Sequence, residues 1–214
     1  MEEFNEKQLW IMHHALEIFA AKGFEGTSVR DIAKAANVNV SMISYYFGSK
    51  EKLLEAIVKN HSIKTQHHLA SIAFSANTSP FVKITRIVDH YINVFTSQSR
   101  FRNLLHTEIK AMDPAGPVFI MIRDMKKANK AFLAQTIREG QEKGVFRNDV
   151  DVSMLVYSIV GVLNYIVSNK PFICEDNGLD PDDDEAYREK IIDKMGQHIK
   201  DSILALITVV PHEK

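Results

Sequence analysis

Residues 27–52 read TSVRDIAKAANVNVSMISYYFGSKEK, and this segment carries most of the information on the fold. Ser28 and Asp31 have the spacing of a capping box, which predicts the start of a short helix. Asn37 tolerates the left-handed backbone of a tight turn, and Asn39 can cap a second helix. Two short helices joined by a tight turn are typical of a helix-turn-helix, which places its second helix in the DNA major groove.

The second short helix, residues 39–46, is expected to have a core-facing side and an outer side. Ile43 and Phe47 point to the core, which leaves small polar and aromatic residues on or near the outer face: Val40, Ser41, Ser44 and Tyr45. Lys50 follows in the first turn of a helix capped by Ser49, where a phosphate would meet both the lysine and free backbone N–H groups. This pattern favours a surface that reads duplex DNA.

The rest of the chain has apolar residues at helical spacing, and no segment has the period of two that a strand would show. We therefore expect an all-α protein of about nine helices, with an N-terminal three-helix helix-turn-helix domain at residues 1–50 and a C-terminal ligand-sensing and dimerisation domain at 51–214. The expected helices cover residues 5–22, 28–36, 39–46, 49 into the seventies, 80 through 95, 101–110, 118–144, 151–168 and 184–209, with a polar loop at 170–183.

The bulk composition limits the class of protein. The net charge of −1 gives no global preference for nucleic acid, so any DNA affinity must come from a local patch. Cys174 is the single cysteine, which excludes an internal disulfide. The polar N-terminus does not resemble a signal peptide, and the most apolar stretch, residues 154–167, is shorter than the about 20 residues of a membrane span. A cytoplasmic protein without a membrane partner is expected.

The run ALEIFAAKGFEGTSVRDIAKAANVNVSMISYYFGSKEKLLEAIV, residues 15–58, resembles the TetR family of bacterial transcription regulators. The resemblance implies phosphate contacts at the start of the second helix, a recognition helix at residues 39–46, and a phosphate-gripping lysine. One departure is that many members have Gly-Thr-Leu-Tyr where this chain has Ser-Met-Ile-Ser at 41–44. The residues expected to bind DNA are Thr27, Ser28, Arg30, Asn39, Val40, Ser41, Ser44, Tyr45, Tyr46 and Lys50.

The apolar stretch 154–167 predicts a dimer, because a helix without a polar face must be covered on every side. One side can meet the core and the other a second subunit, as in TetR-like proteins, and Gly161 would allow close approach. A fully internal helix in a monomer is the competing interpretation. A two-fold dimer implies a pseudo-palindromic operator. The expected interface residues are Leu155, Ile159, Val162, Ile166, Met195, Ile199, Ile203 and Leu206.

A small-molecule effector, partly apolar in character, is the second expected partner. Methionine and aromatic side chains around a few polar groups suit an adaptable pocket, although plain core packing is the better explanation for each residue taken singly. The candidate ligand-binding residues are Phe95, His106, Glu108, Met112, Met125, Tyr157, Asn164 and Tyr165. Effector binding is expected to move the long helix that begins at Ser49 and so change the separation of two DNA-reading heads.

Enzymatic function is not expected. The adjacent pairs His13-His14 and His67-His68 are expected to point in different directions on a helix, and the sequence has no His-Glu-x-x-His, paired cysteines or glycine-rich phosphate loop. The acidic run 180–185 lacks the ligand spacing of an EF-hand. No catalytic residue, cofactor or metal is therefore expected. The predicted function is a ligand-responsive repressor; an activator and an interaction module that does not bind DNA remain alternatives.

Overall fold

The structure is a computed structural model that describes residues 4–108 and 113–209, without the side chains of Ser99 and residues 106–108. Regular structure in these residues is helical, apart from an isolated antiparallel bridge between Phe146 and Thr208. The all-α prediction is confirmed. The chain divides into two compact units: unit 1 is Met1–His67 with Gln98–Ala128, and unit 2 is His68–Ser97 with Asn129–Lys214.

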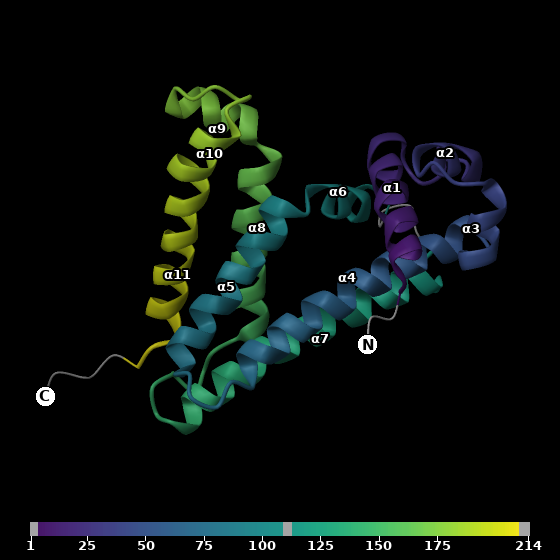
Figure 1. Cartoon of the computed structure of the whole chain (residues 1–214). Helices are drawn as coiled ribbons and strands as arrows, with labels where there is room; N and C mark the ends of the chain where they lie inside the picture. The colour runs from purple at the N-terminus through teal and green to yellow at the C-terminus, as the bar shows by residue number, and fades with distance from the viewer. Residues whose placement is uncertain (1–3, 109–112, 210–214) are drawn as a thin grey trace, which may run out of the picture. The chain divides into compact units, whose positions relative to one another are not determined.

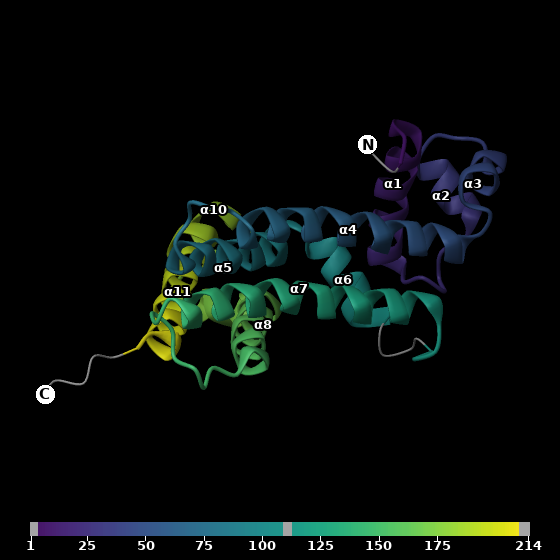
Figure 2. The ribbon, with the colours of Figure 1, turned by 90° about the horizontal axis from the view of Figure 1, so that it is seen from below.

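Unit 1 holds the N-terminal helices and α6, and helices α4 and α7 contribute residues to both units (Figures 1 and 2). The bounds of these helices are α1 Glu6–Lys22, α2 Val29–Ala35, α3 Val40–Phe47, α4 Lys50–Ala73, α6 Ser99–Glu108 and α7 Pro117–Glu142. Unit 2 adds α5 Pro80–Ser97, α8 Val152–Ser168, α9 Lys170–Asn177, α10 Asp184–Tyr187, a π-helical turn Arg188–Asp193 and α11 Lys194–Ile207.

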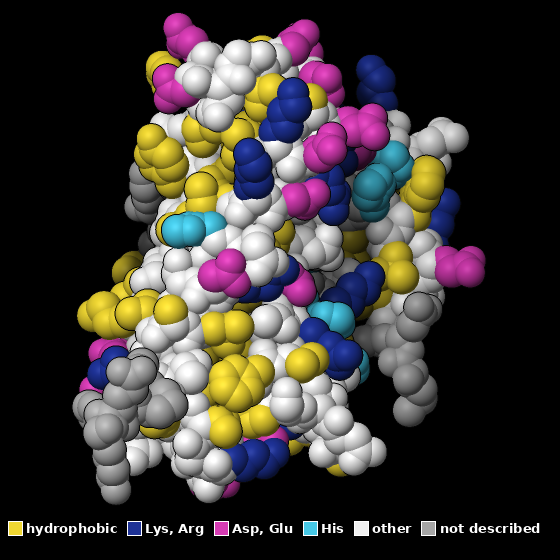
Figure 3. Space-filling view, turned by 90° about the vertical axis from the view of Figure 1, so that its left-hand side faces the viewer, with side chains coloured by type: hydrophobic (Ala, Val, Ile, Leu, Met, Phe, Trp, Pro, Cys, Tyr) yellow, Lys and Arg dark blue, Asp and Glu magenta, His cyan; other side chains and the backbone are white. Residues whose placement is uncertain are grey.

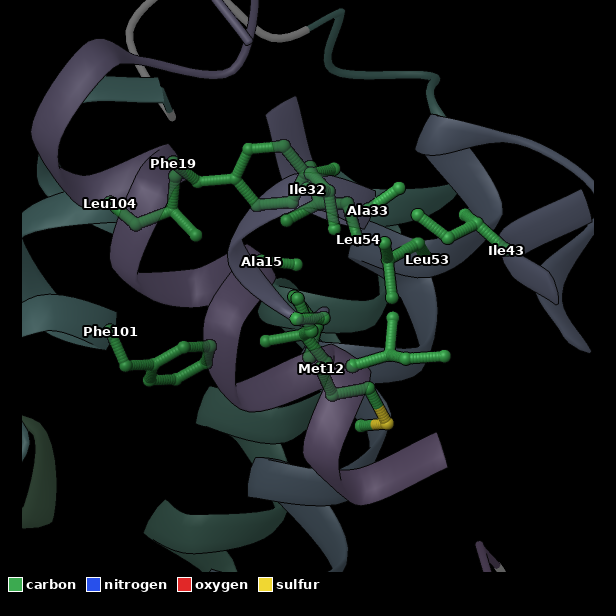
Figure 4. Close-up of a cluster of buried hydrophobic side chains, with 14 of the residues drawn as sticks. Met12, Ala15, Phe19, Ile32, Ala33, Ile43, Leu53, Leu54, Phe101 and Leu104 are labelled. Carbon is green, nitrogen blue, oxygen red and sulfur yellow. The ribbon is translucent and has the colours of Figure 1, made fainter. Parts of the chain in front are cut away.

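The core of unit 1 joins α1, α2 and α3 to the first part of α4 and to α6. Asn5 and Gln8 form the predicted capping box at the start of α1, and the helix then buries residues at three- and four-residue intervals. Figure 4 shows these side chains converging from several helices: Met12, Ala15, Phe19, Ile32, Ala33, Ile43, Leu53, Leu54, Phe101 and Leu104. Each large apolar side chain buried here stabilises the unit by about 1.5–3 kcal/mol.

The core of unit 2 packs α5 against α8 and α11, which lie beside it in Figure 1. Gly196 on α11 permits this packing, because a Cβ there would lie 2.9 Å from the Cδ1 of Ile92 on α5. Gly140 on α7 lies directly against the ring of Phe146, which a Cβ at this position would overlap. A larger residue at position 140 would therefore overlap the Phe146 ring, whereas one at position 196 would require the terminal methyl of Ile92 to shift.

A buried lysine ties three helices of unit 2 together. Lys83 on α5 is only 3% exposed. Its ammonium donates to the carbonyl of Ala73 at 2.9 Å and to Oε2 of Glu139 at 2.6 Å. Oε1 of Glu139 accepts from Lys143, also at 2.6 Å. The two lysines hold the pKa of Glu139 below its ordinary value, mainly through hydrogen bonds, of which the one from Lys143 is the larger. This arrangement satisfies a charge that burial would otherwise destabilise.

Two features differ from the sequence-based expectation. The segment predicted as a polar loop at 170–183 contains α9, which has a proline in its first turn and ends at Gly178 in a left-handed conformation (φ 63°). The chain also divides differently from the expected boundary at residue 50, because α4 as far as His67 and all of α6 belong to unit 1. Leu53 and Leu104 are buried in the core of that unit.

No single helix in the described ranges is long and apolar enough to cross a membrane, whereas α8 and α9 together reach that length and composition with a 76° bend between them.

Candidate DNA-binding surface

Helices α2 and α3 are joined by the tight turn that the sequence predicts. Asn37 has φ 50°, the left-handed conformation expected of it. The N–H of Val38 donates to the carbonyl of Ala33 at 3.0 Å, which closes the turn. Ser28 and Asp31 form the capping box at the start of α2, and Asn39 caps α3 by accepting from the N–H of Ser41. The predicted helix-turn-helix is therefore present.

A tryptophan outside the predicted site holds this turn in place. The indole Nε1 of Trp10 on α1 donates to the carbonyl of Ala36 at 2.8 Å, at the end of α2. This bond satisfies a carbonyl that the helix itself leaves unpaired. Trp10 is half-exposed, on the polar N-terminal part of α1. Sequence reasoning missed it, because helical spacing does not show which distant carbonyl an indole reaches.

An exposed surface runs from the start of α2 to α3. On α3, Tyr45 is 82% exposed while Ile43 is buried, so the inner and outer sides are as predicted. We call the exposed predicted residues the recognition surface: Ser28, Arg30, Asn39, Val40, Ser41, Ser44 and Tyr45. Tyr46 is not exposed like these residues: it is half-buried against the core of unit 1, and its ring packs edge-to-face on that of Tyr45, with centroids 5.1 Å apart. Tyr46 therefore packs between α3 and the core of unit 1.

The prediction that the side chain of Thr27 contacts DNA is wrong. This side chain was expected to contact phosphate, but Thr27 is only 2% exposed and its hydroxyl donates to the carbonyl of Gly23 at 2.7 Å. Its N–H donates to the carbonyl of Phe24. The residue is buried because the chain folds back here between α1 and α2. Thr27 therefore stabilises the segment that leads into the recognition surface and does not present its side chain to a ligand.

Lys50 is positioned by three contacts within unit 1. Its ammonium donates to the carbonyl of Phe24 at 2.8 Å and to that of Thr27 at 3.1 Å. It also lies 4.2 Å from the centroid of the Phe24 ring, a cation–π arrangement. Ser49 caps α4 as predicted, because its hydroxyl accepts from the N–H of Lys52 at 3.2 Å. Lys50 thus has a structural role that the sequence did not show.

Among the described residues, some charged side chains near the recognition surface lie close to an opposite charge and others do not. Lys22 lies 3.8 Å from Asp31. Hydrogen bonds from Ser28 hold the pKa of Asp31 below its ordinary value, so this carboxylate stays ionised. Among the residues that the structure describes, no carboxylate lies within 4.0 Å of Arg30 or Lys34. Two cations of α2 are therefore available to an anionic partner.

The residues predicted for a dimer interface mostly face inward. Unit 2 buries five of them in its own core: Leu155, Ile159, Ile166, Ile199 and Ile203. Val162 and Met195 are partly buried against the same unit, and only Leu206 is exposed. The correction has a simple reason, since the most apolar stripe of a helix is the one that its own core covers first. The exposed side of α8 carries Met154, Tyr157 and Tyr165 instead.

The described members of the predicted ligand-binding set belong to both units. Tyr157 and Tyr165 are about two-thirds exposed on α8. Phe95 packs against the core of unit 2 and Met125 against that of unit 1. Asn164 is half-buried. Met112 and the side chains of His106 and Glu108 lie outside the described residues.

Unit 2 also has a groove of about 430 Å³ between the end of α4 and α5, which sequence reasoning did not find. Its lining includes His68, Arg86, Asp89 and His90. Burial, with a smaller contribution from the nearby His68, lowers the pKa of His90 to about 4. None of the predicted ligand residues lines this groove.

The helix-turn-helix with an exposed recognition helix, in an all-helical chain, defines the class of a DNA-binding regulator. The family model "Bacterial regulatory proteins, tetR family" matches residues 11–57, and "Tetracyclin repressor-like, C-terminal domain" matches residues 80–195. The second match alone covers more than half of the chain. The chain therefore belongs to the tetR family of bacterial regulatory proteins.

Individual relatives agree with this assignment. The transcriptional repressor NicS of Pseudomonas putida is 25% identical over 160 residues, which is 75% of each chain. The ketosteroid transcriptional regulator KstR2 of Mycobacterium tuberculosis has a similar structure, with a TM-score of 0.71 and 19% identity over 97% of this chain and 98% of that one. AibR, whose structure contains isovaleryl coenzyme A and operator DNA, matches with a TM-score of 0.65 and 20% identity over 95% and 98%. The two structural likenesses show the fold.

Proposed function

We propose that this protein is a repressor that binds a pseudo-palindromic DNA operator as a homodimer and releases it when a small-molecule effector binds. The proposal rests on the exposed recognition surface of the helix-turn-helix. The capping box of α2, the hydrogen bond from Trp10 and the buried core of unit 1 stabilise this motif. A pre-formed reading element loses little entropy on binding DNA. NicS and KstR2, both named as repressors, support repression as the sign of regulation.

The DNA contacts follow from exposure and charge. Arg30 and Ser28, at the start of α2, suit phosphate contacts, which position a protein on the duplex. The exposed residues of α3 suit base contacts in the major groove, with Tyr45 the largest of them. Lys50 has three N–H donors, two of which hold backbone carbonyls. The third donor is the one proposed to meet a phosphate, at the first turn of α4.

Dimerisation is proposed through the exposed apolar side of unit 2. Met154, Tyr157 and Tyr165 recur on one side of α8 at helical spacing. Exposed Phe172 on α9 and Leu206 on α11 add apolar surface, and Figure 3 shows hydrophobic side chains between charged ones on the side that carries α11. A Cβ added to Gly161, which lies between Tyr157 and Tyr165, would meet nothing within 4 Å. A helix of a second chain can therefore approach closely there.

The effector is proposed to be partly apolar, as in the initial expectation. AibR, with isovaleryl coenzyme A and operator DNA in one structure, is a relative in fold that binds both kinds of ligand. For this chain, the effector must prefer one of two arrangements of the DNA-binding units, because a ligand with equal affinity for both shifts nothing. A coupling of 1–3 kcal/mol, roughly 5- to 150-fold in operator affinity, is typical of such regulation.

Selection of bound fragments from the host's genomic DNA, followed by footprinting, tests this function. We expect a protected site with two half-sites related by a two-fold axis and separated by about one helical turn or a multiple of it. Transcription in vitro from that site distinguishes repression from activation. Failure to enrich any fragment at low and at moderate salt would favour the alternative of an interaction module that does not bind DNA.

A further inference from the structure

Three potential metal ligands lie together on α1, and none of them is a residue of the recognition surface. Nε2 of His13 lies 3.7 Å from Oε1 of Glu17, and Nδ1 of His14 lies 3.4 Å from Oε2 of the same carboxylate. One ligand atom from each of the three residues lies within 4.8 Å of the others. The side chains are accessible in different degrees: His13 is 57% exposed, Glu17 34% and His14 19%.

This arrangement corrects the expectation that adjacent histidines on a helix point in different directions. Glu17 is four residues after His13 and three after His14, so the carboxylate lies one turn along the helix and within reach of both. The two rings turn towards it, with centroids 5.2 Å apart. Sequence reasoning considered the two histidines as a pair and overlooked the third residue that brings them together.

We propose that His13, His14 and Glu17 form a binding site for a divalent transition-metal ion. Ligand atoms each about 2.1 Å from a tetrahedral ion are about 3.4 Å apart, so the observed separations need only small side-chain rotations. Two imidazoles and one carboxylate suit Zn²⁺, Ni²⁺, Cu²⁺ or Fe²⁺ rather than Mg²⁺ or Ca²⁺. The three protein ligands leave at least one position for water.

The environment of His14 decides which of its nitrogens binds the ion. Its Nε2 is buried and has no hydrogen-bond partner among the described residues, so an ion has access only from the Nδ1 side. The ring of Trp10 packs edge-to-face against that of His14, with centroids 4.4 Å apart. This packing limits rotation of the imidazole and keeps Nδ1 directed towards Glu17.

Arg100 competes with the ion for the same carboxylate. Its Nη1 lies 3.3 Å from Oε1 of Glu17, and its side chain is 62% exposed. A guanidinium at this place repels a cation and occupies one carboxylate oxygen. The site is therefore expected to bind more tightly when the arginine is removed, an effect in the opposite direction from damage to the fold.

Trp10 gives a direct measurement, because it is the single tryptophan of the chain and contacts His14. The experiment titrates Ni²⁺ into full-length protein without a histidine tag and follows tryptophan fluorescence. We expect saturable quenching at one ion per chain, reversed by EDTA. Diamagnetic Zn²⁺ is expected to displace Ni²⁺ and restore the emission.

The variants separate this site from general metal binding to surface histidines. His13→Ala and Glu17→Gln are each expected to weaken binding at least ten-fold, and Arg100→Ala to strengthen it several-fold. His67→Ala in the second adjacent pair is the matched control, with no change expected. Circular dichroism verifies that each variant is folded. Quenching that does not saturate, or equal affinity in the wild type, His13→Ala and Glu17→Gln, would overturn the proposal.

Discussion

The ammonium of Lys50 donates a 2.8 Å hydrogen bond to the backbone carbonyl of Phe24 and lies 4.2 Å from the centroid of its ring. This relationship fastens the start of α4 to the segment between α1 and α2. The residue expected from sequence to grip phosphate thus also holds the fold of unit 1. Its substitution should therefore affect stability and DNA binding together.

Lys50→Ala is expected to lower the free energy of unfolding by about 1.5–3 kcal/mol, because it removes charge-assisted hydrogen bonds to two carbonyls. Lys52→Ala is the matched control. Lys52 is exposed and pairs with Glu55 only three residues away, so its loss should cost less than about 1 kcal/mol. Urea unfolding measures both. Equal stability of the two variants would contradict the structural role of Lys50.

Lys83→Met is expected to lower the stability of the protein by about 3 kcal/mol, because removing one partner of a buried pair leaves the others uncompensated. The carbonyl of Ala73 loses its donor and Glu139 keeps only Lys143. Lys143→Met serves as the comparison, since Lys143 is 52% exposed and should contribute much less. Chemical denaturation should show a larger loss in the free energy of unfolding for Lys83→Met than for Lys143→Met. The reverse order would contradict the structural role of Lys83.

Acid should weaken the same arrangement. The pKa of Glu139 is held below its ordinary value of 4.5, chiefly by the hydrogen bond from Lys143 and then by that from Lys83. A carboxyl with a lowered pKa in the folded state contributes stability that is present above the unfolded value and is lost as pH falls through the folded value. Stability measured from pH 6 to pH 3 should therefore decline less steeply in Glu139→Gln than in the wild type. Parallel profiles would contradict this prediction.

His61 should give the protein a second acid dependence, at higher pH. Burial lowers its pKa to about 4, against an ordinary value of 6.5, and its ring stacks on Phe101 with centroids 3.9 Å apart. The folded state keeps this histidine neutral. Above pH 6.5 the histidine is neutral in the folded and in the unfolded chain. As pH falls from 6.5 towards 4, only the unfolded chain binds the proton, so the free energy of unfolding decreases by up to about 3 kcal/mol.

His61→Phe keeps the stacked ring and removes the titration, so its stability should vary less between pH 6.5 and 4. His198→Ala, at an exposed histidine of α11, is the control and should retain the wild-type slope. Thermal unfolding across this range provides the measurement. An unchanged slope in His61→Phe would show that His61 is not kept neutral by burial.

Tyr157→Glu should convert the proposed dimer to a monomer, because it places a charge at the centre of the exposed apolar side of α8. The control is Phe74→Glu, since Phe74 has nearly the same exposed fraction, 67% against 65%, but follows the end of α4. Light scattering at micromolar concentration should give a dimer for the wild type and the control. A wild-type monomer would reject the dimer, and a dimeric Tyr157→Glu variant would reject this interface.

The local features of unit 1 could be predicted because they depend on neighbouring residues. The Ser28–Asp31 capping box and the left-handed Asn37 follow from spacing and backbone chemistry. Contacts over long sequence separations could not be predicted in this way. The bond from Trp10 to Ala36 and the burial of Thr27 depend on tertiary packing, and helical periodicity alone does not indicate how far a side chain reaches.

In unit 2, helical periodicity could not predict which side of a helix is buried. The apolar stretch at 154–167 does lie on a helix, α8. Periodicity did not distinguish the side covered by the chain itself, which includes Ile159, from the side left exposed, which includes Tyr157. The candidate ligand residues stay a prediction for a related reason. Methionine and aromatic composition describes a pocket and a core equally well.

The central claim is that the recognition surface binds DNA, and substitution of Arg30 and Tyr45 tests it most directly. Both side chains are exposed and are not among the buried residues of unit 1, so stability should change little. The measurement is the affinity of the double variant Arg30→Ala, Tyr45→Ala for the operator selected from genomic fragments, as a function of salt. We predict at least a ten-fold loss of affinity and a salt slope reduced by about one. Wild-type affinity with an unchanged slope would contradict the claim.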